Sequence, residues 1–176
     1  FVIDAQGNIA ARYDKIHMFD VDLATGESWR ESNAYAPGEQ VVTVDTPAGR
    51  LGLAICYDLR FPALFEALGQ ARCDLIAVPA AFTVPTGEAH WETLLRARAI
   101  ETGAFILAPA QGGTHEDGRR TWGRSTVVGP WGEVIAKLDH DDPGVLFATL
   151  DLDAVDTARR AVPALTHDRD FAPPVR

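Results

Sequence analysis

The chain has 176 residues, of which 47% are hydrophobic and 23% are charged, and its formal net charge is −9. These values are typical of one globular domain with a sizeable core, and no apolar run approaches the length of a membrane span. The acidic balance, with only short basic pairs such as Arg119-Arg120, argues against nucleic acid or a membrane as a partner.

The first part of the chain predicts two hairpins and one helix. Turn-forming residues separate short apolar runs, which is the pattern of paired strands. The elements are a hairpin of 1–3 and 9–13, a loop over 19–39, a hairpin of 41–45 and 50–56, and a helix over 61–71.

The second part predicts strands that are buried on both faces, because two of its runs are apolar throughout. The elements are strands 75–78 and 105–108, a helix over 86–102, a hairpin of 125–128 and 133–136, a strand over 144–150, and a short helix from 153. In the helix, Thr86 is expected to act as the N-cap, and Trp91, Leu95 and Ala99 share one face.

This order of elements predicts the fold class. Strands that alternate with helices and are followed by further strands indicate an α/β protein with a sheet of mixed strand direction and helices stacked on it. Two such sheets packed face to face would also fit. We expect one domain over 1–176, with a tail from about 163 to 176 that is rich in proline and charge.

Cys56 is the most informative candidate for chemistry. It follows the apolar run 51–55 and precedes the predicted helix, so it lies on a strand-to-helix turn that would present its thiol to a cleft. The alternative is a buried, inert thiol, which is the commonest role of a free cysteine. The two cysteines are too few for a disulfide scaffold, and a bridge between Cys56 and Cys73 is disfavoured in a composition typical of the cytosol.

A catalytic thiol needs a base or a cation, because a free cysteine is only partly ionised near neutral pH. His17 and His90 are the better-placed histidines. Lys15 offers a cation that could stabilise both a thiolate and an oxyanion, against the alternative of an ordinary surface lysine. Glu31 lies in the predicted loop. No spacing typical of a metal site or of a phosphate-binding loop is present.

Several segments together resemble the nitrilase superfamily of carbon–nitrogen hydrolases. The matching segments are 13–20 (YDKIHMFD), 31–38, 52–62 (GLAICYDLRFP), 86–92, 96–102 and 122–133. They occur in order over nearly the whole chain. Within the family the chain is most similar to the branch of deaminated-glutathione amidase and omega-amidase, and residues 108–112 (APAQG) favour the former.

The resemblance implies a nitrilase-like αββα sandwich of mixed sheets, here without its N-terminal part, and a Glu–Lys–Cys triad. Cys56 would be the nucleophile, Lys15 the triad lysine, and Glu31 a second glutamate that orients the lysine and the substrate. The backbone N–H of Tyr57 would help to bind the oxyanion. The first glutamate, the general base, matches nothing in the chain and is expected upstream of Phe1, so the chain alone is expected to be impaired.

The implied activity is hydrolysis of a small omega-amide through a cysteine thioester, with release of ammonia and without a cofactor. Deaminated glutathione and a 2-oxo-acid omega-amide are the candidate substrates. The alternatives are an inactive binding or assembly module and a hydrolase of N-carbamoyl or aliphatic amides.

The sequence also suggests where substrate would bind. The candidates are Phe82 and Thr83 after a buried strand, His90 at the start of a helix, and Arg60, for which an ion pair that braces the turn is the favoured alternative. Arg98 and Glu101 are expected to form a structural pair. By resemblance the protein is expected to be a homodimer or larger homo-oligomer. We expect a cytoplasmic location, with any targeting segment outside the sequence.

Overall fold

The computed structural model describes residues 1–24 and 26–175, and its largest sheet is six-stranded with the order β12-β11-β8-β7-β6-β5. Its strands are β5 (Thr43–Thr46), β6 (Gly49–Leu53), β7 (Leu75–Ala77), β8 (Phe105–Ala108), β11 (Thr126–Val128) and β12 (Val134–Lys137). The pairs β6–β7 and β7–β8 are parallel, and the outer pairs are antiparallel. The expected mixed α/β sheet is thereby confirmed.

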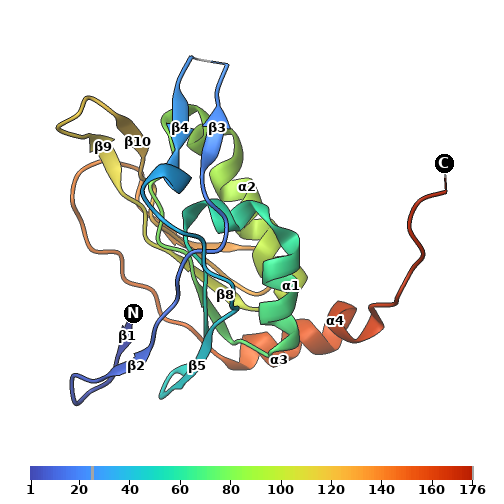
Figure 1. The fold of residues 1–176 in the computed structure, drawn as a ribbon. Helices are drawn as coiled ribbons and strands as arrows, with labels where there is room; N and C mark the ends of the chain where they lie inside the picture. The colour runs from blue at the N-terminus through green and yellow to red at the C-terminus, as the bar shows by residue number, and fades with distance from the viewer. Residues whose placement is uncertain (25, 176) are drawn as a thin grey trace.

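Two helices, α1 (Pro62–Gln70) and α2 (Val84–Thr102), cover one face of this sheet and lie side by side (Figure 1). Beneath them runs a row of paired residues, Ile76, Ile106 and Val128, each fully buried. Gly52 continues this row, and a Cβ on it would come within 2.9 Å of the Leu68 side chain of α1. The helices therefore pack closely enough to require glycine at that point.

The helices form where the apolar spacing predicts them. In α2, Trp91, Leu95 and Ala99 recur every four residues and are all buried, which places one face against the core. Gly103 ends the helix in the left-handed conformation with a φ of 57°, where glycine avoids the penalty of a side chain. Helix α2 begins at Val84, so the prediction that Thr86 caps it is wrong; Thr83 is its N-cap residue.

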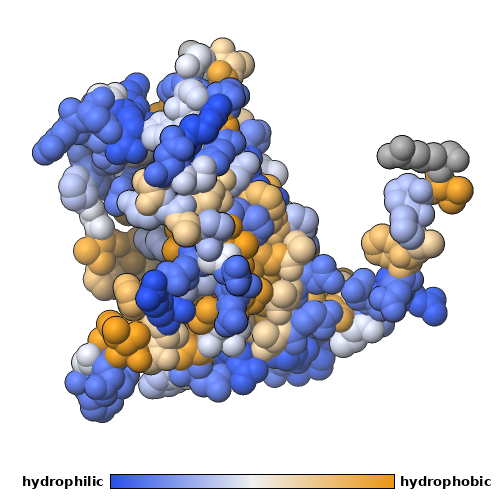
Figure 2. All heavy atoms as spheres, in the orientation of Figure 1, coloured by the Kyte–Doolittle hydropathy of each residue, from blue (hydrophilic) through white to orange (hydrophobic). Residues whose placement is uncertain are grey.

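The opposite face of the sheet carries a smaller core. Leu75 and Phe105 pack there against Val155 of α3 (Asp153–Ala161), and the short helix α4 (Ala164–His167) follows. The segment beyond α4 runs away from the body of the molecule, where it can be followed in both whole-molecule views (Figures 1 and 2). None of the described helices combines the length and apolarity needed to cross a membrane.

The predicted hairpins are present, and two further hairpins were missed. Strands β1 (Val2–Ile3) and β2 (Ile9–Ala11) pair as expected. The predicted loop 19–39 instead contains β3 (Asp20–Asp22) and β4 (Ser28–Arg30), joined by an Asp22–Arg30 ion pair of 2.9 Å and followed by a 3-10 turn, Glu31–Asn33. Each of these strands has only three residues, which is too short for its polar–apolar–polar alternation to be recognised as a strand.

The second missed hairpin consists of β9 (Gly112–Thr114) and β10 (Arg120–Trp122), and its surface is mostly hydrophilic (Figure 2). The strand expected over 144–150 is absent from the described residues. Its apolar side chains Val145 and Phe147 are 75% and 86% exposed. An apolar pattern alone cannot form a strand there, because a strand also needs a neighbour with which to share its hydrogen bonds.

Candidate active site

The carboxyl ends of the three parallel strands meet at one edge of the sheet. The Cys56 N–H donates to Pro79 O at 2.9 Å, and Ala80 forms a parallel bridge with Ala110. The chain segments that follow β6, β7 and β8 therefore continue side by side past the ends of the strands. This is the edge at which open α/β sheets bind ligands.

Cys56 lies on a sharp turn at this edge. Ile55 is extended, Cys56 has a φ of 50°, and a 3-10 helix, Cys56–Arg60, leads into α1. A positive φ is uncommon for a residue with a side chain, and such strained positions often occur at functional sites. The structure thus supports the expected strand-to-helix turn.

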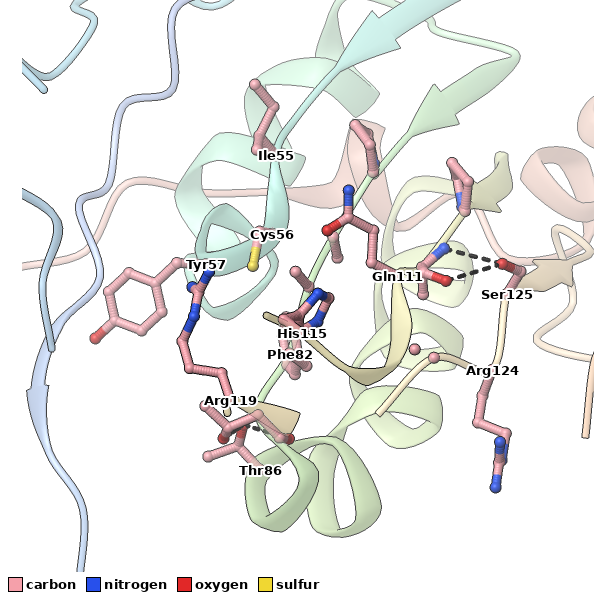
Figure 3. A pocket seen from close by; sticks show the side chains of 18 of the residues that line it. Ile55, Cys56, Tyr57, Phe82, Thr86, Gln111, His115, Arg119, Arg124 and Ser125 are labelled. Atoms are coloured by element: carbon pink, nitrogen blue, oxygen red, sulfur yellow. Dashed lines mark hydrogen bonds between the residues drawn. The ribbon is translucent and has the colours of Figure 1, made fainter. Parts of the chain in front are cut away.

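The turn opens onto a cavity of about 1100 Å³, at the upper end of the range of ligand pockets. Lys15, Glu31, Tyr57 and Cys56 all line it. Figure 3 shows the sulfur of Cys56 on the same side of the turn as the side chains of Phe82, Gln111 and His115. The fold therefore brings together Lys15, Glu31 and Cys56, the three residues expected to be catalytic. They lie up to 41 positions apart in the sequence.

Lys15 and Glu31 form a close ion pair in the wall of the cavity, with side chains 11% and 26% exposed. The same Glu31 oxygen accepts a hydrogen bond of 2.7 Å from the Phe19 N–H. Glu31 begins the 3-10 turn after β4, so the missed hairpin carries this carboxylate to the lysine. The pair fixes the lysine ammonium at the cavity wall, since both groups are largely withdrawn from water.

The pKa of the Cys56 thiol is raised above its ordinary value, chiefly because burial disfavours the thiolate. The backbone N–H of Ala81, the Lys15 ammonium and the backbone N–H of Tyr57 act in the opposite direction, while the charge of Glu31 raises it further. Cys56 therefore rests mainly as a thiol, and its attack on a substrate requires a group that removes the proton. Two backbone N–H groups near the sulfur are suited to stabilise negative charge.

The predicted binding residues differ in their placement. Phe82 and Thr83 are buried and line the cavity, as does Arg60. His90 is not among the described residues that line the cavity. Its Nδ1 lies 3.2 Å from Arg60 Nη1. The expected ion pair of Arg60 is not found among the described residues. The guanidinium instead lies 5.3 Å from the centre of the Phe82 ring.

Many residues that line the cavity were not predicted from the sequence. The residues concerned come from the β9–β10 hairpin and the loop after β12, and include Gln111, His115, Arg119, Arg124 and Asp141. Arg124 forms an ion pair with Asp141 that closes this side. The pair Asp117-Gly118, in the turn between the two strands, was the available signal for a hairpin here.

Other predictions concern residues outside the cavity. Trp91 is 1% exposed and belongs to the core, and Arg98 and Glu101 pair at 2.7 Å, so both structural interpretations are confirmed. Cys73 is fully buried, and both cysteines are free thiols. In the described part of the chain, no three His, Cys, Asp or Glu side chains are grouped to hold a metal ion.

Known proteins are similar to nearly the whole chain. The chain is 51% identical over 169 residues to the deaminated glutathione amidase of Yersinia enterocolitica, covering 96% of the chain and 59% of that protein. It is 44% identical to the deaminated glutathione amidase of Homo sapiens, covering 96% of the chain and 51% of that protein. The chain thus spans little more than half the length of these relatives.

Solved structures extend the similarity to the fold. The NitFhit protein of C. elegans superposes with a TM-score of 0.86 at 45% identity, over 95% of this chain and 40% of that one. A variant of the amidase from Nesterenkonia sp. AN1 gives a TM-score of 0.73 at 30% identity, over 90% of this chain and 57% of that one. In that variant the active-site cysteine carries the acetamide moiety of fluoroacetamide. The family described as carbon-nitrogen hydrolase matches residues 1–160, and the chain belongs to that family.

Proposed function

We propose that the protein is an amidase that hydrolyses the C–N bond of a small omega-amide through a thioester on Cys56. One observation carries this proposal: the strained cysteine and the Lys15–Glu31 ion pair face the same cavity. A thiol on a sharp turn that faces a cavity, beside a fixed ammonium, is the arrangement that nucleophilic acyl transfer requires.

The reaction follows from these groups. A base removes the Cys56 proton, and the sulfur adds to the amide carbonyl. The oxyanion is stabilised by Lys15 and by the backbone N–H of Tyr57, and loss of one such donor typically costs about 3 kcal/mol in barrier. The base returns the proton to the amide nitrogen, which leaves as ammonia from a primary amide or as an amine from a substituted amide such as deaminated glutathione. Water then hydrolyses the thioester to the acid. We assign the base to a carboxylate, the first glutamate of the family's triad.

The wall of the cavity supports a substrate that carries a carboxylate. Arg60 lines the cavity and, among the described residues, has a histidine and aromatic rings as neighbours but no carboxylate. Burial lowers the pKa of its guanidinium. A partly buried cation without a counter-ion is stabilised by an anionic ligand. Deaminated glutathione, named in the relatives, and 2-oxo-acid omega-amides both carry such a group.

The test is cleavage of four amides by the intact protein. Release of cysteinylglycine is followed for deaminated glutathione, whose amide nitrogen belongs to a dipeptide, and release of ammonia is followed for a 2-oxo-acid omega-amide, an N-carbamoyl amino acid and a simple aliphatic amide. We expect release from the first two, loss of release in Cys56→Ala, and formation of a hydroxamate when hydroxylamine competes with water for the thioester. Arg60→Met should raise KM for the carboxylate-bearing amides most.

Failure to cleave any of these amides would favour the binding-module alternative. Release only from the N-carbamoyl or aliphatic amide would retain the chemistry but overturn the substrate assignment. The homo-oligomeric state and the cytoplasmic location remain predictions from the sequence.

A further inference from the structure

Asp58 is a fully buried carboxylate whose hydrogen bonds the proposed chemistry does not use. It is 0% exposed, and four donors converge on its two oxygens. Oδ1 accepts from the backbone N–H of His17 at 3.0 Å and from its ring Nδ1 at 2.8 Å. Oδ2 accepts from the Tyr13 hydroxyl and the Ile55 N–H, both at 2.8 Å. Among the described residues, no lysine or arginine pairs with it.

The donors flank both residues that the proposed reaction uses. Tyr13 and His17 each lie two positions from Lys15, one on either side, and Ile55 directly precedes Cys56. One buried carboxylate therefore joins the segment that carries the lysine to the turn that carries the thiol.

A second contact strengthens the same connection. The His17 ring stacks on Phe61, with centroids 3.5 Å apart and planes 6° from parallel, immediately after the 3-10 helix that begins at Cys56. On the lysine side, the Ile16 N–H donates to the Tyr13 hydroxyl at 3.4 Å. The lysine segment is thus held at both of its ends rather than at one point.

The chemistry of the site requires an aspartate. A carboxylate has two oxygens that only accept, so it can satisfy four donors at once. An asparagine of the same shape would turn its NH₂ group toward one pair of donors and lose at least the bond to the backbone N–H of that pair, His17 or Ile55. Unpaired buried donors are costly, so the two segments would separate or shift.

We propose that Asp58 is a positioning residue that fixes Lys15 relative to Cys56, and this inference rests on the roles proposed above for those two residues. Asp58 touches neither substrate nor the reacting sulfur. Its effect passes through the backbone on both sides: it sets where the ammonium stands when the thiolate and the oxyanion form. Displacement of a catalytic group by about 1 Å can cost on the order of 100-fold in rate.

The test is Asp58→Asn in the intact protein, measured by kcat, KM and the rate of Cys56 alkylation as a function of pH. We expect kcat to fall by roughly 10- to 100-fold with KM little changed. The pH profile of alkylation should shift to higher pH, because the Lys15 ammonium that lowers the Cys56 pKa is no longer held in place. The charge of Glu31, which raises this pKa, then has less to oppose it. Tyr13→Phe, which removes a single donor, should give a smaller change of the same kind.

Asp74→Asn is the matched control. Asp74 accepts the Arg50 N–H at 2.8 Å near the start of β6, at the end of the strand away from Cys56. It should lower stability without moving the alkylation profile. If Asp58→Asn does not fold, Tyr13→Phe decides the question.

The outcomes separate this inference from the proposed function. An unchanged alkylation profile in a folded Asp58→Asn or Tyr13→Phe variant overturns the positioning role even if stability falls. Absence of amide cleavage by the unmodified protein overturns the proposed function. The alkylation profile would still test the positioning role in that case, because alkylation needs no turnover.

Discussion

Alkylation of the two cysteines offers the sharpest test of the candidate site. Iodoacetamide added to the native protein should modify Cys56 and spare Cys73, because Cys56 lines the cavity whereas Cys73 is 0% exposed. Burial also raises the pKa of Cys73 to about 11. Thiolate is the reactive form, so access and ionisation both protect Cys73.

The size of this protection can be worked out. At pH 8 an exposed thiol is about one quarter ionised, whereas a thiol with a pKa of 11 is about 0.1% ionised, a difference of roughly 200-fold. Reaction at Cys73 also requires opening of the core. With a stability of about 5 kcal/mol, the open form is roughly one molecule in 5000. Because burial also raises the pKa of Cys56, Cys56 should react more slowly than an exposed thiol. We therefore expect the rate at Cys56 to exceed the rate at Cys73 by only part of this protection, about 100-fold.

The role of the lysine is tested by Lys15→Met. The variant removes the positive charge that favours the Cys56 thiolate, so alkylation at pH 8 should slow by roughly 10-fold. The two proteins should react at similar rates at high pH, where the thiol ionises without help. Lys137→Met is the control, since Lys137 pairs with Glu92 at 2.9 Å and is absent from the described lining of the cavity.

The assay is mass spectrometry of peptides taken at intervals, with guanidinium-unfolded protein as the reference for equal access. Labelling of Cys73 at a rate comparable to that of Cys56 in the native protein would refute the reasoning. An equal rate in Lys15→Met across the whole pH range would refute the role of the lysine.

Two further predictions concern stability. Because burial raises the Cys73 pKa from 9.0 to about 11, the folded state keeps a proton that the unfolded state loses, so the free energy of unfolding should fall between about pH 9 and 11, by about 3 kcal/mol at most. Urea titrations should show a flatter pH slope in Cys73→Ala; an unchanged slope would contradict this. The pKa of Tyr13 is raised by burial and by Asp58, which adds a loss of the same sign above pH 10. Gly87→Ala should destabilise the protein by about 1–3 kcal/mol, since the added Cβ would lie 2.3 Å from the Trp122 side chain; thermal unfolding at or above the unsubstituted midpoint would disprove the close packing.

Much of the candidate site was predictable because its chemistry lies in short local motifs. A thiol after an apolar strand indicated Cys56, and the segment around Lys15 carried the resemblance to the family. The buried strands β7 and β8 were predicted well, since an apolar run has few alternatives to a strand covered on both faces. The far wall of the cavity was not, because Arg119, Arg124 and Asp141 carry no local pattern and gain their place only through pairing.

The sequence by itself determined the strands of the main sheet, the helices that cover it, the mixed α/β class and the candidate nucleophile, because local spacing of apolar residues and turn formers decides these features. Only the tertiary structure decided which polar groups meet. In the sequence Asp58 is one acidic residue in a predicted turn. In the fold it accepts hydrogen bonds from Tyr13, His17 and Ile55. Glu31 likewise reaches Lys15 through a hairpin too short and polar to be recognised. The physical reason is that a buried carboxylate is satisfied by whichever donors the packing brings to it, and packing joins residues that are far apart in the chain.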